Sequence, residues 1–362
     1  MNILRLFVLM PLVAMALALA SSGASAEQAT RIEWRDEIVQ DFDLASPTRI
    51  NIWNSRIMGV DETVDRGNVL LCKSDVDPKF GACATKAVWS ARDRTEIALL
   101  FTEARSHAQI ALKVFGFRNN FSEFPEQALH SAVHSTGERA PAVTVWIESG
   151  ELRKLPSGGI WKATLKLNQQ NWHQSPGQAL AESTVEFTLR VTDTKNIQIF
   201  LPEHNTTTPT VDLGLIGQVS RDGRTTGRRN IDMCLYDGFG AHSSRFDVTI
   251  KDGLTVPQRA PENFSVVRDG TSGQSPRERI DYRVTYVHNG QRKTFINGET
   301  VSLPGGNNAE VRSVYLPNIP VPVMCKPMPL TLETPEFNAK EKAAGSYTGR
   351  LKIIFSPSAQ SL

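Results

Sequence analysis

Two stretches of the chain, VTVWIE (143–148) and RFDVTI (245–250), decide its fold class. Every second residue in each stretch is apolar, namely Val143, Val145, Ile147, Phe246, Val248 and Ile250. A repeat of two residues puts these side chains on one face of an extended strand and their neighbours on the other. Both stretches therefore predict β-strands that bury one face in a core.

Turn signals separate these strands from others along the chain. Asn289-Gly290 falls between the strand-like runs 282–287 and 294–296, which is a good hairpin signal. Pro156-Ser157-Gly158-Gly159 and Pro304-Gly305-Gly306 mark further turns. Helical periodicity is nearly absent, and only residues 123–133 are expected to hold a short helix. Many short strands between such turns predict an all-β protein made of β-sandwiches.

The length of 362 residues suffices for two domains with separate cores. A polar tetrapeptide at 192–195 lies between strand-like runs and predicts a boundary there, which gives segments 27–193 and 194–362. All six tryptophans fall in the first segment, so we expect two differently built domains rather than a repeat. The formal net charge of +2 gives no indication of nucleic acid or an acidic membrane as a partner.

The first residues have the pattern of an export signal. Arg5 precedes an apolar run, 6–20, and Ala24-Ser25-Ala26 matches a cleavage site for signal peptidase. We expect residues 1–26 to be removed and the mature chain to begin at Glu27. An uncleaved membrane anchor is the alternative, but the run is short for a membrane span.

Export makes disulfides possible, and the chain has four cysteines. Three pairings can be drawn from the sequence alone. We favour Cys72–Cys83 with Cys234–Cys325, because each pair then lies within one half of the chain. A metal site is the competing interpretation, and the absence of any C-x-x-C spacing disfavours it.

Several long strings resemble a known family, the tip minor subunits of class 5 chaperone–usher fimbriae, which comprise the colonization-factor tip adhesins and the CblD-like pilus biogenesis initiators. The strings are GELRKLPSGGIWKATLKLN (150–168), NIQIFLP (196–202), RNIDMCLYDGF (229–239), LPNIPVPVMCKP (316–327) and GSYTGRLKIIFSPSAQSL (345–362). Weaker matches are VDRGNVLLC (64–72), GAC (81–83) and LFTEARS (100–106). The resemblance is dense from about residue 143 to the end of the chain.

The resemblance implies two tandem immunoglobulin-like β-sandwich domains, an N-terminal adhesin domain and a C-terminal pilin domain. The pilin domain would lack its last strand, which a periplasmic chaperone and then the N-terminal strand of the major pilin would supply. An outer-membrane usher would export the protein to the fimbrial tip at the cell surface. The residues that match the chaperone-contacting C-terminal strand are Tyr347, Leu351, Ile353, Phe355 and Leu362.

The resemblance also places a receptor site on the first domain. The family's basic patch has one arginine before the first cysteine, which Arg66 matches, and an arginine pair that is replaced here by Asn171 and Trp172. Arginine suits a carboxylate, whereas an amide and an indole ring suit a neutral sugar. We therefore expect a host glycan or glycoprotein receptor without an acidic sugar. The alternative is an assembly initiator that binds no receptor.

The sequence gives little indication of enzymatic activity, a cofactor or a metal site. The chain has no G-x-S-x-G, P-loop, dinucleotide-binding or EF-hand motif, so we expect no enzyme and no cofactor; a secreted carbohydrate-active enzyme is a distant alternative. His130, His134 and Glu138 could share a helix face as metal ligands, but the H-E-x-x-H pattern is absent and no metal is expected. Three tryptophans on strand-like segments are expected in the core: Trp89, Trp146 and Trp161.

Overall fold

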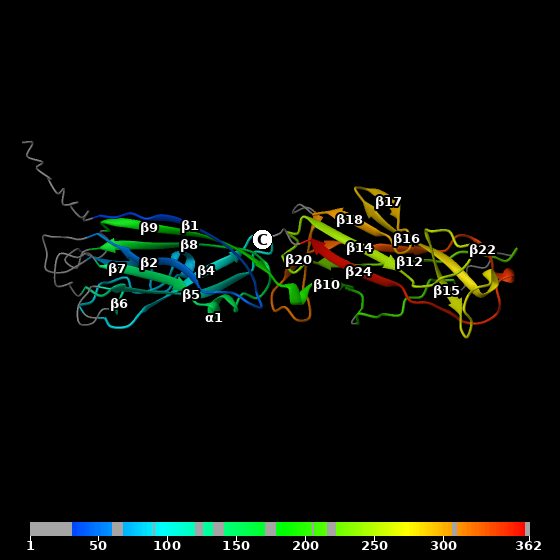
Figure 1. Ribbon diagram of the computed structural model, residues 1–362, viewed down its shortest axis with the longest axis horizontal. Helices are drawn as coiled ribbons and strands as arrows, with labels where there is room; N and C mark the ends of the chain where they lie inside the picture. Colours follow the sequence, from blue (N-terminus) through cyan, green and yellow to red (C-terminus); the bar gives the residue numbers. More distant parts are fainter. Residues whose placement is uncertain are drawn as a thin grey trace, which may run out of the picture.

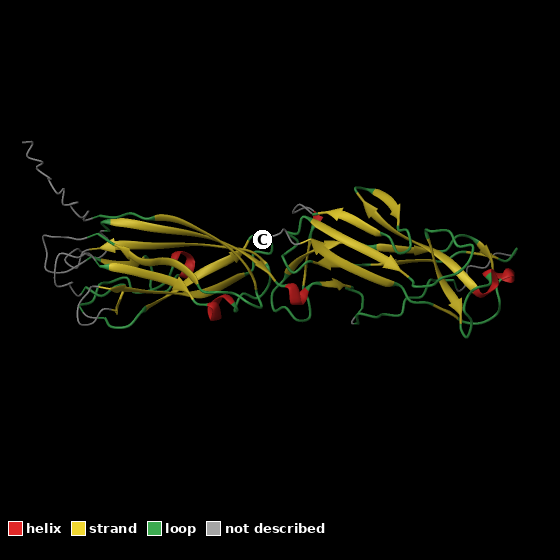
Figure 2. Cartoon of the chain, viewed as in Figure 1, coloured by secondary structure: helices red, strands yellow, loops and turns green. Residues whose placement is uncertain are grey.

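The computed structural model describes residues 31–59, 68–89, 91–119, 126–132, 141–170, 179–204, 206–215, 222–305 and 310–358. Two bodies of β-strands follow one another along the long axis (Figure 1). Figure 2 shows that strands dominate both and that helices are short. The protein is therefore mostly β, as the alternation of its residues predicts, and it has two domains, as its length and the polar tetrapeptide at 192–195 predict.

The first domain is a single sheet that folds over on itself, in the order β1-β9-β8-β4-β5-β7-β2, with β3 paired to β8 and β6 to β5. All its pairs are antiparallel except β1 with β9. Its elements are β1 (Arg35–Asp43), β2 (Ile50–Ile57), β3 (Val69–Cys72), η1 (Pro78–Phe80), β4 (Thr95–Glu103), β5 (Gln109–Asn119), β6 (Glu126–Ala128), β7 (Ala142–Ile147), α1 (Ser149–Leu152), β8 (Gly159–Gln170) and β9 (Ala181–Thr192).

The two edge strands of this sheet meet through side chains. Asp36 on β1 accepts a hydrogen bond from Trp53 Nε1 on β2 at 2.8 Å and forms an ion pair with Arg56 at 2.5 Å. The fold encloses a core of alternate residues, so that Val185, Phe187 and Leu189 of β9 are all buried. The apolar area that these side chains remove from water is what holds the two layers together.

The second domain begins after a short connection, η2 (Thr194–Asn196). Its elements are β10 (Gln198–Phe200), β11 (Arg224–Thr225), β12 (Arg228–Ile231), β13 (Cys234–Tyr236), β14 (Arg245–Lys251), β15 (Asn263–Arg268), η3 (Pro276–Glu278), β16 (Arg279–His288), β17 (Gln291–Thr294), β18 (Thr300–Pro304), β19 (Arg312–Val314), β20 (Val323–Pro327), β21 (Leu330–Glu333), β22 (Phe337–Asn338), η5 (Ala339–Glu341), β23 (Tyr347–Thr348) and β24 (Lys352–Ser358).

The core of the second domain lies between two sheets. One has the strand order β12-β21-β16-β15-β23, with β17 paired to β16, and the other has the order β18-β14-β24. The buried side chains between them include Phe246 and Val248 of β14, Val284 of β16 and Leu330 of β21. The predicted hairpin is confirmed, since Asn289 (φ 52°) and Gly290 (φ 73°) join β16 to β17 with the positive φ values that such a two-residue turn needs. A smaller cluster surrounds the disulfide between β13 and β20.

Two local predictions were wrong. Residues 126–128 form β6, which pairs with β5, instead of part of a helix. Trp89 is 49% exposed because it lies in an irregular connection rather than on a strand. Trp161 is fully buried, and Trp146 is buried on the opposite face from the main core, against Phe115.

The two domains are in contact where the backbone of one lies close to the backbone of the other. Asp193 N, between β9 and η2, donates a hydrogen bond to Gly238 O at 2.7 Å. A Cβ atom on Gly158 would collide with the same carbonyl of Gly238, so only glycine fits at this position. Val321 of the second domain also packs against the core of the first.

Candidate strand-accepting site

The last described strand, β24, has one free edge. It pairs antiparallel with β14, which puts Phe355 opposite Val248 and Ile353 opposite Ile250. Within the described part of the chain no strand pairs with its other side. The backbone N–H and C=O groups along that side are therefore available to another chain.

The core is only half covered along β24. Phe246, Val248 and Ile250 of the neighbouring β14 are fully buried, whereas Ile353 and Phe355 pack on the same core but are half-buried. The rings of Phe246 and Phe355 are stacked, 5.8 Å apart between centroids. Among the described residues no strand lies further out to cover these two side chains.

The segment that follows β10 contributes further half-buried apolar side chains. Val211 and Leu213 pack against this same core, although residues 206–215 form no strand. Asp212 O accepts a hydrogen bond of 2.9 Å from Nε of Arg229, which is part of β12, and this bond holds the segment near the other sheet. In Figure 1 this segment runs below the red strand β24.

A free strand edge next to uncovered apolar side chains is the arrangement used in β-augmentation. An added strand forms main-chain hydrogen bonds with the edge, and its alternate side chains fill the uncovered positions. The chemistry available at this site is therefore the binding of an extended peptide, with no covalent step.

The structure separates Tyr347 from the other residues predicted on the C-terminal strand, so this part of the prediction was wrong. Tyr347 lies on β23, which pairs with β15, and its hydroxyl donates to Ala343 O at 2.7 Å. The chain crosses from one sheet to the other between Thr348 and Lys352. Leu351, Ile353 and Phe355 do face the core together, and Leu362 lies outside the described residues.

The predicted receptor residues Arg66, Asn171 and Trp172 also lie outside the described residues, as do His134 and Glu138. The described part of the chain contains no group of three His, Cys, Asp or Glu side chains that could hold a metal ion. Within the same residues no helix has the length and apolar character to cross a membrane.

The disulfides have the favoured pairing. Cys72 is bonded to Cys83, and Cys234 is bonded to Cys325, with sequence separations of 11 and 91 residues. The second bond joins β13 to β20 at the end of the domain that faces its neighbour. It therefore fixes the part of the second domain on which the first domain rests.

One group of residues at the domain contact was not assigned any role from the sequence. Glu103 Oε1 on β4 lies 3.4 Å from His242 Nε2, and Arg105 Nη1 donates to the carbonyl oxygen of Ala241. Glu103 also accepts hydrogen bonds from Ser106 N and Oγ, at 2.6 and 2.8 Å, and from Ile160 N at 3.1 Å. Glu103 and Arg105 belong to the string LFTEARS, whose resemblance to the family was the available signal.

These contacts determine the charge of Glu103. Burial by itself raises the pKa of the carboxyl group, but the hydrogen bonds from His242, from Ser106 and from Arg105 N outweigh it and lower the pKa to about 2. Glu103 is therefore ionised at neutral pH in a side chain that is almost fully buried. Its negative charge is part of what joins the domains.

Comparisons with known proteins agree with this architecture. The family model for the first domain of CfaE, the E subunit of CFA/I fimbriae, matches residues 22–194, and the model for its second domain matches residues 197–359. The chain is 30% identical over 306 residues to the fimbrial E subunit of CFA/I from Escherichia coli, covering 81% of each protein.

Solved structures give the same result in three dimensions. The crystal structure of CfaE, the adhesive subunit of CFA/I fimbria of enterotoxigenic Escherichia coli, matches with a TM-score of 0.76 and 28% identity over 92% of this chain and 95% of that one. A chaperone–tip adhesin complex of CFA/I fimbriae matches with a TM-score of 0.68 and 27% identity, over 92% of this chain and 99% of the other. This chain therefore belongs to the CfaE family, the non-enzymatic tip adhesins of class 5 chaperone–usher fimbriae at the cell surface.

Proposed function

We propose that this chain occupies the tip of a fimbria, accepts one β-strand from the next subunit to begin assembly, and binds a host glycoconjugate through its first domain. The observation that supports strand acceptance most directly is the free edge of β24 beside half-buried Ile353 and Phe355. A donated strand would pair with this edge and cover those side chains, so both hydrogen bonding and burial favour it.

A periplasmic chaperone would hold the same edge before assembly. It would contact Leu351, Ile353 and Phe355, and the C-terminal Leu362, until the usher passes the protein outward. The N-terminal strand of the major pilin would then replace the chaperone. The similarity to a chaperone–tip adhesin complex of CFA/I fimbriae supports the chaperone as a partner.

The domain organisation fits a place at the tip. We assign residues 1–26 to a signal peptide, 27–193 to the adhesin domain and 194–362 to the pilin domain. The adhesin domain then precedes the pilin domain, at the position where other subunits carry their N-terminal donor strand. Separate cores on either side of η2 support the division.

The receptor site would lie on the adhesin domain and include Arg66, Asn171 and Trp172. An amide and an indole in place of two arginines favour a neutral sugar, which the indole face can stack on and the amide can hydrogen-bond. Arg66 would add a charged donor at the margin of the site.

Strand acceptance is tested by binding of a synthetic peptide with the N-terminal strand of the major pilin to residues 27–362. We expect Ile353→Asp to abolish binding, because a carboxylate would be buried beneath the donated strand. Lys352→Ala is the matched control, since Lys352 is exposed and points away from the core. Equal peptide affinity of the Asp variant and the wild type would contradict the proposal.

Receptor binding is tested on a glycan array with the same protein, completed by a fused donor strand. Arg66→Ala and Trp172→Ala should each abolish binding to a neutral glycan without lowering the melting temperature. A folded protein that binds peptide but no glycan would leave the alternative, an assembly initiator that does not adhere.

A further inference from the structure

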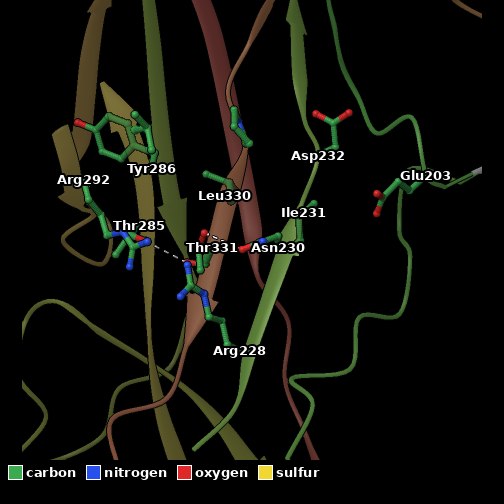
Figure 3. Close-up of a pocket in the computed structure, with 12 residues that line it drawn as sticks. Glu203, Arg228, Asn230, Ile231, Asp232, Thr285, Tyr286, Arg292, Leu330 and Thr331 are labelled. Carbon is green, nitrogen blue, oxygen red and sulfur yellow. Dashed lines mark hydrogen bonds between the residues drawn. The ribbon is translucent and has the colours of Figure 1, made fainter. Parts of the chain in front are cut away.

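The second domain has a hollow of about 370 Å³ on the sheet that does not contain β24. It lies over β12, β21 and β16 and is drawn in Figure 3. Arg228 extends toward Thr331 on one side of the hollow, and Glu203 lies on the opposite side. Neither the strand-accepting edge nor the receptor residues of the first domain contribute to it.

Two arginines, Arg228 and Arg292, and two carboxylates, Glu203 and Asp232, line the hollow, and Asp232 is already paired with Arg312 at 3.0 Å. Glu333 on β21 is opposite Arg228 on one neighbouring strand and Arg283 on the other, and it forms a long ion pair of 3.7 Å with Arg292. Arg283 has another partner, Glu262, at 3.2 Å. The described residues supply no carboxylate within ion-pair distance of Arg228. Its exposed guanidinium is therefore available to an anion, and guanidinium is well shaped for a carboxylate.

Neutral hydrogen-bonding groups continue from Arg228 across the sheet. Thr331 Oγ1 donates to Asn230 Oδ1 at 2.9 Å, which fixes the amide so that its NH₂ group is available to a ligand. Glu203 supplies acceptor oxygens on the far side. Donors and acceptors that line the same hollow suit a ligand with several hydroxyl groups.

Apolar surface is present as well. Val287 lines the hollow and is 59% exposed, so it offers a contact for the C–H face of a sugar ring. The volume is at the small end of the range of about 300–1,000 Å³ that is usual for small-molecule sites. One or two sugar units would fill it.

We propose that this hollow binds a sugar unit that carries a carboxylate. Arg228 binds the carboxylate, Asn230 donates to ring hydroxyls, Glu203 accepts from them, and Val287 contacts the ring. Such a site would add an acidic-glycan contact on the pilin domain, separate from the receptor site proposed for the adhesin domain, and it does not depend on that site.

Two probes that differ only in one group test this proposal: glucuronic acid and glucose. Ligand-observed NMR on residues 27–362 with a fused donor strand should detect saturable glucuronate binding and no glucose binding. Arg228→Gln should weaken glucuronate binding at least about tenfold, because a charge-assisted hydrogen bond is lost. Asn230→Ala should weaken it as well.

Arg153→Gln is the control for net charge, since Arg153 is exposed and lies on the first domain. It should leave glucuronate binding unchanged. Melting temperatures check that each variant is folded, and Arg228 is exposed, so its loss should not unfold the domain. Equal affinity for glucose and glucuronate, unchanged binding by Arg228→Gln, or no glucuronate binding at all would each overturn the proposal.

Discussion

Glu103 and His242 lie 3.4 Å apart across the contact between the two domains, one at the end of a strand of the adhesin half and the other in the loop before β14. The carboxylate is held on its own side by Ser106 and Ile160 N, so its position does not depend on His242. The Glu103 carboxylate is therefore already in position to accept a hydrogen bond from His242 in the loop of the other domain. This pair makes the domain contact sensitive to protonation.

Acid should weaken this contact. The pKa of Glu103 is lowered to about 2, below its usual 4.5, so the stabilisation is complete above about pH 4.5 and is lost as the pH falls toward 2. The shift corresponds to about 3 kcal/mol at most, which His242 shares with the hydrogen bonds from Ser106 and Arg105 N within the first domain. Calorimetry from pH 7 to pH 3 should show a steeper fall in melting temperature for the wild type than for Glu103→Gln. Parallel curves for the two proteins would show that Glu103 is not the titrating group.

A side chain at Gly158 should separate the domains without unfolding them. Alanine there would meet the carbonyl of Gly238, so the hydrogen bond from Asp193 N to that carbonyl should break. Small-angle scattering should report a wider range of interdomain distances for Gly158→Ala. Gly150→Ala is the control, because an added Cβ at Gly150 meets nothing within 4 Å. Scattering identical to the wild type would contradict the tight contact.

The half-covered core predicts a stability effect that depends on the donor strand. Phe246→Ala should cost about 3–5 kcal/mol, as expected for a fully buried ring. Phe355→Ala should cost clearly less in the free protein, because that ring is only partly buried. Its cost should rise toward that of Phe246→Ala when a donor strand is fused to the chain. Calorimetry of the second domain's transition measures the loss of stability in each variant, with and without the fused donor strand. If the cost of Phe355→Ala were the same with and without the donor, the donor would not cover Phe355 and the prediction would be wrong.

The two disulfides should contribute unequally. The chain-entropy model gives about 3 kcal/mol for the loop closed by Cys72–Cys83 and about 4.6 kcal/mol for that closed by Cys234–Cys325. All six tryptophans are in the first domain, so their fluorescence follows that domain alone. Cys234→Ala/Cys325→Ala should lower the second calorimetric transition with little change in tryptophan fluorescence. The opposite pattern is expected for Cys72→Ala/Cys83→Ala.

Several features follow from residues close together in the chain. Alternation at 143–148 and 245–250 predicts β7 and β14, and Asn289-Gly290 predicts the turn between β16 and β17, because strand faces and two-residue turns are set by neighbouring residues. Membership of the fimbrial family was also visible in long strings such as RNIDMCLYDGF. These properties needed no knowledge of how distant segments meet.

Other features depend on contacts between distant segments and could be found only in three dimensions. Tyr347 has the spacing of the C-terminal strand but belongs to another sheet, because the chain changes sheets after Thr348. The free edge of β24 exists because no other described strand pairs with that side, and the Glu103–His242 contact joins residues 139 positions apart. Periodicity reports which face of a strand is apolar, whereas tertiary packing decides what covers that face.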